Sequence, residues 1–108
     1  MVWPNYVAVQ ITLTLADTNY NVLALVRAVE EACPASAREL CLESDKANDA
    51  ASKIMIGDSN LSGTRYGYQL SPGDSRTYRA MVQNVPFGVL YARSASAGLK
   101  LNVEVMAA

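Results

Sequence analysis

Histidine is absent from this chain, and cysteine occurs only twice, as Cys33 and Cys41. Histidine is the usual base beside a serine nucleophile, and protein zinc sites are built mainly from Cys and His. A serine triad and a zinc site therefore lack residues that they normally need. We expect two free thiols that pack as small apolar groups, with a disulfide as the alternative if the two segments meet.

Charge is also scarce, because Lys, Arg, Asp and Glu make up 18% of the residues and leave a net charge of -1. Without a basic stripe, nucleic acid is not an expected partner. No segment approaches the roughly 20 apolar residues that span a bilayer. The first five residues do not resemble a secretory signal. We therefore expect a soluble protein made in a cytoplasm, with no membrane partner and no cofactor.

The 108 residues, 51% of them apolar, have the size of one domain. We expect a single domain over residues 1–108 with a short N-terminal arm at 1–5. Trp3 lies in this arm, and a Trp so placed either covers the core of its own domain or docks on a neighbouring subunit.

Apolar residues alternate with polar ones in two long segments, 6–15 and 99–105, which predicts half-buried strands. Between residues 21 and 32 the period changes to that of a helix, with Val22, Val26, Val29 and Cys33 on one stripe. Asp17, Thr18 or Asn19 is the expected N-cap, and Pro34 the stop.

Further short strands are predicted at 38–44, 53–56, 66–70, 76–82 and 87–93. The Ser71-Pro72-Gly73-Asp74 turn lies between two of them, so residues 66–70 and 76–82 are expected to form a hairpin. This pattern of strands with one early helix predicts a mainly β protein, an antiparallel β-sandwich with one α-helix near the N-terminus.

Two segments could carry chemistry. Residues 54–60 (IMIGDSN) resemble the nucleophile block of the SGNH hydrolases, but Ser59 has no histidine to activate it and the chain is too short for that larger α/β fold. A strand-ending loop whose short polar side chains bond to their own backbone is the favoured interpretation. The Asp45-Asn48-Asp49 loop offers oxygen ligands for calcium, yet it lacks the Gly and Glu of an EF-hand loop.

Tyrosine and arginine are concentrated around the predicted hairpin and on a later strand. These residue types are enriched at protein interfaces, because they bury a large area and keep a polar group. The alternative is that Tyr78 and Tyr91 are core residues with a solvated edge. The interface candidates are Trp3, Arg65, Tyr66, Tyr68, Arg76, Arg79 and Arg93.

The second part of the chain, residues 38–106, resembles small accessory proteins of tailed-phage virions. The resemblance rests on Lys53 to Ser59, on Tyr68 to Ser75 and on Leu90 to Gly98 before the terminal strand. In that family a Leu-x-Pro-Gly-x-Ser turn leads into the next strand and the last two strands form a hairpin. The resemblance implies a jelly-roll-like fold and no catalytic residues. The helix at 21–32 departs from the pattern.

These observations lead to one expected function with two alternatives. We expect a non-enzymatic virion protein that decorates or cements a phage capsid, binding the major capsid protein or other virion proteins as a homo-oligomer, with a trimer as the expected assembly. A neck, tail or fibre-base component is the first alternative. A carbohydrate-binding module, with Tyr side chains stacking on sugars, is the second.

Overall fold

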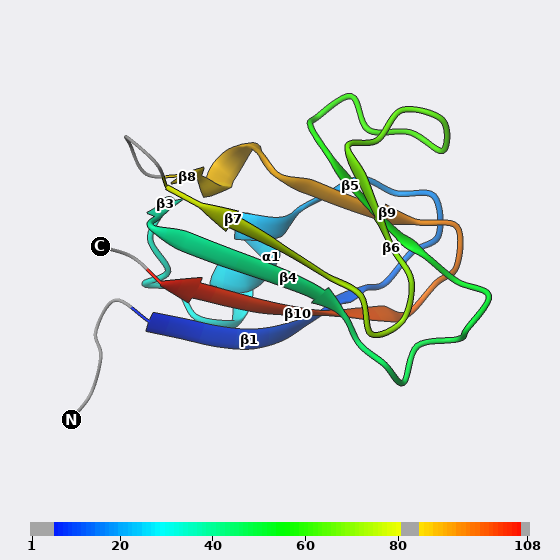
Figure 1. Ribbon diagram of the computed structural model, residues 1–108, viewed down its shortest axis with the longest axis horizontal. Coiled ribbons are helices and arrows are strands. Elements are labelled where there is room, and N and C mark those ends of the chain that lie inside the picture. The colour runs from blue at the N-terminus through cyan, green and yellow to red at the C-terminus, as the bar shows by residue number, and fades with distance from the viewer. Residues whose placement is uncertain (1–5, 81–84, 107–108) are drawn as a thin grey trace.

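The computed structural model describes residues 6–80 and 85–106 (Figure 1). Two antiparallel sheets of four strands each dominate it. Sheet A has the strand order β1-β10-β4-β7, formed by β1 (Tyr6–Leu13), β10 (Leu99–Met106), β4 (Glu39–Ser44) and β7 (Ser75–Arg79). Sheet B has the order β2-β9-β5-β6, formed by β2 (Tyr20–Asn21), β9 (Tyr91–Ser94), β5 (Ile54–Gly57) and β6 (Tyr68–Leu70).

Three smaller elements complete the described part of the chain. The strands β3 (Ser36–Ala37) and β8 (Val85–Pro86) form a two-residue ladder, and the 3₁₀ turn η1 (Phe87–Val89) follows β8 directly. The α-helix α1 (Val22–Val29) lies behind sheet A in the view of Figure 1. The predicted mainly β class, with antiparallel sheets and one helix near the N-terminus, is confirmed.

The core follows from the period-two pattern of the two long strands. In β10 the odd residues Leu99 to Val105 are buried and the even residues face outward, and β1 pairs with β10 in one unbroken register from Tyr6↔Met106 to Leu13↔Leu99. Buried side chains from both sheets, from α1 and from η1 join in a single cluster. Phe87, the only phenylalanine, is fully buried in it.

The helix is shorter than predicted, and its N-cap is not one of the three expected residues. The Asn21 side chain accepts a hydrogen bond from the Ala24 N–H at 2.9 Å, as an N-cap does. Asp17 instead adopts a left-handed φ of 52° in the preceding turn. The helix ends at Val29, so Val29 is 63% exposed although it belongs to the predicted apolar stripe. Cys33 of that stripe is buried beyond the helix end.

The predicted hairpin of residues 66–70 and 76–82 is wrong. β6 pairs with β5 in sheet B, whereas β7 pairs with β4 in sheet A. The connecting turn docks on the end of β4, because the Gly73 N–H donates to the Ser44 carbonyl and the Ser44 N–H donates to the Asp74 carbonyl. Gly73 has a φ of +88°, which suits glycine. The turn therefore carries the chain from one sheet to the other.

The strand predicted at 87–93 begins as η1 and becomes a strand only at Tyr91. The last two strands, β9 and β10, lie in different sheets, so the terminal hairpin that the resemblance implies is absent from the described residues. Residues 81 and 82 of the predicted strand 76–82 lie outside the described ranges. Within those ranges, no helix is long and apolar enough to cross a membrane.

Candidate functional site

The Arg76 guanidinium lies over two tyrosine rings, one from each sheet, at the edge strands β6 and β7. Its guanidinium carbon lies 5.0 Å from the ring centre of Tyr68 on β6 and 5.3 Å from that of Tyr78 on β7. Both distances are within the range of a cation–π contact. We call these three residues the Arg-Tyr rim.

The strand registers explain why the rim residues point toward each other. Tyr68 lies opposite the buried Ile56, and Arg76 lies opposite the buried Leu42. Opposed residues of an antiparallel pair share a face, so both side chains point to the inner side of their sheets. Because β6 and β7 are the edge strands, these side chains cover the open edge of the core instead of entering it.

The rim is accessible, as an interface requires. Tyr68 is 39% exposed and Arg76 is exposed, whereas Tyr78 is half-buried and packs against the core. The interpretation of Tyr78 as a core residue with a solvated edge therefore agrees with its place, and it contacts Arg76 as well. Tyr91 is also half-buried.

Arg65 and Tyr66 lie in the loop between β5 and β6, beside a hollow of about 260 Å³ that Gly57 and Gly67 also line. The Arg65 Nη2 lies 3.3 Å from the Asp58 Oδ2, and both side chains are well exposed. An exposed pair of this kind contributes little to stability. The pKa of Asp58 is lowered, first by the hydrogen bond from the Asn60 amide and then by Arg65. This hydrogen bond from the Asn60 backbone to the Asp58 side chain confirms that residues 57–60 form a strand-ending loop whose polar side chains bond to their own backbone.

The other predicted interface residues are not part of the rim. The Arg79 Nε lies 3.6 Å from the Glu39 Oε2 on the outer face of sheet A. Arg93 is largely covered, with 21% of its side chain exposed, and it holds Asn19 at 3.3 Å and Asp17 at 3.7 Å. Arg93 therefore binds the loop before β2 to sheet B, and little of its side chain is accessible to a partner. Trp3 and the arm 1–5 lie outside the described residues.

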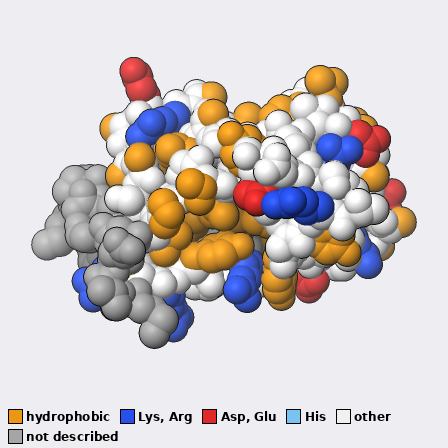
Figure 2. All heavy atoms as spheres, turned by 90° about the horizontal axis from the view of Figure 1, so that it is seen from above, with side chains coloured by type: hydrophobic (Ala, Val, Ile, Leu, Met, Phe, Trp, Pro, Cys, Tyr) orange, Lys and Arg blue, Asp and Glu red, His pale blue; other side chains and the backbone are white. Residues whose placement is uncertain are grey.

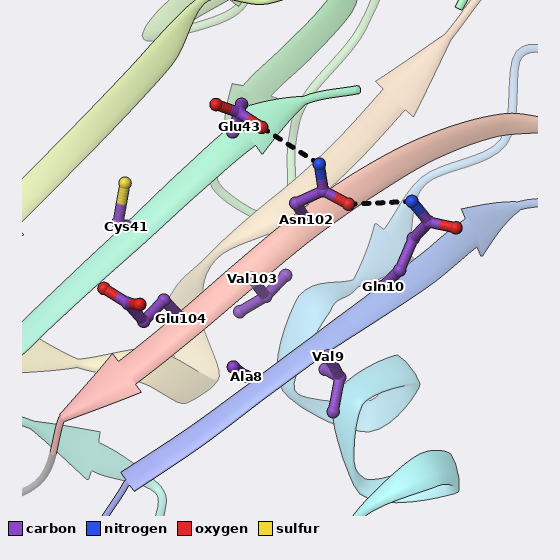
Figure 3. A pocket seen from close by; sticks show the side chains of 8 residues that line it. All are labelled: Ala8, Val9, Gln10, Cys41, Glu43, Asn102, Val103 and Glu104. Atoms are coloured by element: carbon purple, nitrogen blue, oxygen red, sulfur yellow. Dashed lines mark hydrogen bonds between the residues drawn. The ribbon is translucent and has the colours of Figure 1, made fainter. Parts of the chain in front are cut away.

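The outer face of sheet A carries a shallow depression of about 370 Å³ that sequence reasoning missed (Figure 3). The Gln10 amide donates to Asn102 at 2.9 Å, and the Asn102 amide donates to Glu43 at 3.0 Å. Beside them the Tyr6 hydroxyl donates to Glu104 at 2.6 Å, which raises the pKa of Tyr6. In the sequence, the only indication of this depression was the row of polar residues at even positions of the two long strands. The strand register is needed to show which of these residues lie opposite each other.

The loop that could have held calcium uses its polar groups internally. Asp45 accepts hydrogen bonds from the Ala47 amide and from Asn102, and Asn48 bonds to the backbone of Lys100. In residues 6–80 and 85–106, no group of three or more His, Cys, Asp or Glu side chains is placed to hold a metal ion.

An apolar area lies on the side of the molecule where η1 is found. Figure 2 shows hydrophobic side chains gathered across the middle of this face, with Lys, Arg, Asp and Glu side chains around it. Val89 of η1 is 57% exposed. Exposed apolar area of this kind is common on interaction surfaces.

No protein-family model, curated protein or solved structure matches the chain.

Proposed function

We propose that the chain is a jelly-roll β-sandwich and that it serves as a non-enzymatic structural protein of a tailed-phage virion, decorating or cementing the capsid. The supporting observation is the pairing of the strands. Apart from the short β3 and β8, the first strand pairs with the last, β2 with β9, β4 with β7 and β5 with β6. This nested order in two four-stranded sheets supports the proposal of a jelly roll, a fold used by viral capsid and lectin domains.

The fold alone does not define a function, and a structural role in a virion also needs a surface suited to binding. The Arg-Tyr rim combines two tyrosines with an arginine, the residue types that contribute most to binding energy at protein interfaces. Contact with two rings restricts the motion of the Arg76 side chain, so less entropy is lost when a partner binds it. The major capsid protein is the proposed partner of this rim, with a homo-oligomer on the capsid surface.

Composition of purified particles tests the virion role. Tailed-phage particles that carry this gene are purified on a density gradient, and the chain is quantified by mass spectrometry against the major capsid protein. A copy number in fixed ratio to the capsid protein supports decoration. Only a few copies per particle would instead indicate the neck, tail or fibre base. Absence from the particles would contradict both assignments.

Attachment of variants tests the rim. Tyr68→Ala and Arg76→Ala are each expected to weaken co-sedimentation with capsids by about tenfold, a loss of about 1.4 kcal/mol. Arg79→Ala is the matched control, because Arg79 lies on the same strand but on the outer face of sheet A. Equal attachment of both rim variants and the control would remove the rim from the interface. Calorimetry against oligosaccharides tests the carbohydrate-binding alternative.

A further inference from the structure

One edge of sheet A is a long, regular strand that is open on one side. β1 is the end strand of the sheet, and it pairs with β10 over eight consecutive residues without a bulge. Figure 1 draws it along the lower border of the sheet. Among the residues that the structure describes, β10 is the only strand paired with β1.

The hydrogen bonds of the neighbouring strands identify the backbone groups on the open side. The Asp45 N–H donates to the Lys100 carbonyl, so the even residues of β10 bond toward β4 and its odd residues bond toward β1. The Gly98 N–H donates to the Leu13 carbonyl, in agreement with odd residues of β1 facing β10. The N–H and C=O groups of the even residues of β1 therefore point away from the sheet. These residues are Tyr6, Ala8, Gln10 and Thr12.

Within the part of the chain that the structure describes, β1 lacks the usual protections of an edge strand. Natural sheets block their edges with charges, prolines, bulges or very short strands. The sequence of β1, YVAVQITL, contains neither a charged residue nor proline. The other edges are protected, since β7 carries Arg76 and Arg79, β6 has three residues and β2 has two. β1 is thus the sheet edge best suited to pairing with another strand.

We infer that β1 pairs with β1 of a second copy of this chain, antiparallel and about a two-fold axis at Val9. In that register Tyr6 lies opposite Thr12 of the second copy, and Ala8 lies opposite Gln10. All four outward-facing residues then exchange backbone hydrogen bonds with their opposites. The two sheets A become one continuous sheet across the axis.

The side chains of β1 favour a second copy as the occupant. Val7 and Val9 point toward the core, yet both are only half-buried at this edge. In the dimer Val9 meets Val9 of the second copy and Val7 meets its Ile11, so these side chains lose their remaining contact with water. Because β1 has no charge, two identical strands approach without repulsion. An isologous contact of this kind closes after two subunits.

The mass of the purified full chain in solution is the first measurement. Light scattering is expected to give twice the 11.6 kDa of one chain. The variant Ala8→Pro removes an outward N–H and leaves every bond between β1 and β10 in place, since proline is tolerated at edge positions that face solvent. Its mass is expected to fall by half. Thr77→Pro is the matched control, because by the same alternation its N–H points outward from β7, the other edge of sheet A.

A second variant and a residue-level readout guard against a folding defect. Ala8→Glu places a second carboxylate beside Glu104 at the edge of each copy, so its dimer is expected to weaken at 10 mM salt and to recover at 1 M, where charges are screened within about 3 Å. In hydrogen exchange, the Ala8, Gln10 and Thr12 amides are expected to become protected as the wild-type concentration rises.

Three results would overturn the inference: a wild-type monomer at millimolar concentration, a trimer, or an Ala8→Pro variant of unchanged mass. The trimer expected from the phage resemblance and this two-fold dimer are different assemblies, and the measured mass separates them. The inference does not depend on the virion role, because it concerns the purified chain alone. Absence of the chain from virions would leave the dimer inference standing, whereas a monomer would remove the dimer and the proposed homo-oligomer but not the virion role itself.

Discussion

The guanidinium carbon of Arg76 lies 5.0 Å from the ring centre of Tyr68, although the two residues belong to different sheets. The strand registers direct both side chains inward at the sheet edges, so the contact joins sheet A to sheet B where the core is open. A contact that connects the two sheets is expected to contribute to stability, and this contribution can be measured.

The coupling between Arg76 and Tyr68 is expected to be about 0.5–1 kcal/mol, the range of an exposed cation–π contact. A double-mutant cycle of Arg76→Ala and Tyr68→Ala, followed by urea unfolding, measures it. Arg79→Ala combined with Tyr68→Ala is the control cycle and is expected to be additive, because Arg79 faces the outer side of sheet A. Additivity in both cycles would mean that the stack contributes nothing to the fold.

Asn21→Ala is expected to lower the free energy of unfolding by about 1–2 kcal/mol. The side chain caps α1 through the Ala24 N–H, and its amide also donates to the Gly88 carbonyl at 2.9 Å. Thr18→Ala, at one of the caps expected from sequence, is the control and should change stability by less than about 0.5 kcal/mol. Equal effects of the two substitutions in chemical denaturation would argue against Asn21 as the cap.

Alternation of apolar residues predicted both long strands, although the first ends at Leu13 and Leu15 is 59% exposed. The odd residues of 99–105 are buried as expected, and Leu40 and Leu42 face the core from β4. Alternation says which face of a strand is buried, but it does not say which strand lies beside it. The Ser71-Pro72-Gly73-Asp74 turn therefore predicted a chain reversal correctly and a hairpin incorrectly. The hydrogen bonds of that turn with Ser44, a residue distant in sequence, direct β7 to sheet A and away from β6.

The candidate site was predictable in residue type and only partly in position. Tyr68 and Arg76 do meet at the surface, as their clustering indicated. Arg93 is largely covered and does not join the Arg-Tyr rim, because its contacts are with Asn19, which lies 74 positions away, and Asp17. The prediction of the helix cap failed for the same reason. The Asn21 side chain donates a hydrogen bond to the backbone carbonyl of Gly88, 67 positions away. Local patterns carry no information about such pairs.

The pKa of Asp58 is expected to lie below that of an ordinary aspartate and to remain lowered in the Arg65→Ala variant. The largest cause of its lowered pKa is the Asn60 amide, and the Arg65 guanidinium is a smaller one. A carboxyl NMR titration measures both proteins. Because the folded pKa is lowered, Asp58 stabilises the fold above its unfolded pKa, and this contribution is lost as the pH falls through the folded pKa. Complete return of the pKa to the ordinary value in Arg65→Ala would make the ion pair the dominant cause.

The two thiols are expected to differ in reactivity under native conditions. Cys41 is half-buried on the outer face of sheet A, whereas Cys33 is buried and burial raises the pKa of its thiol. The thiolate is the reactive form, so an aromatic disulfide reagent at neutral pH should modify Cys41 first and Cys33 only after unfolding. Cys41→Ala should abolish the early phase, and Cys33→Ala should leave it unchanged. Because the folded pKa of Cys33 is raised, its contribution to stability is complete below the unfolded pKa and declines as the pH rises through the folded value. Rapid labelling of both thiols in the folded protein would contradict the burial of Cys33.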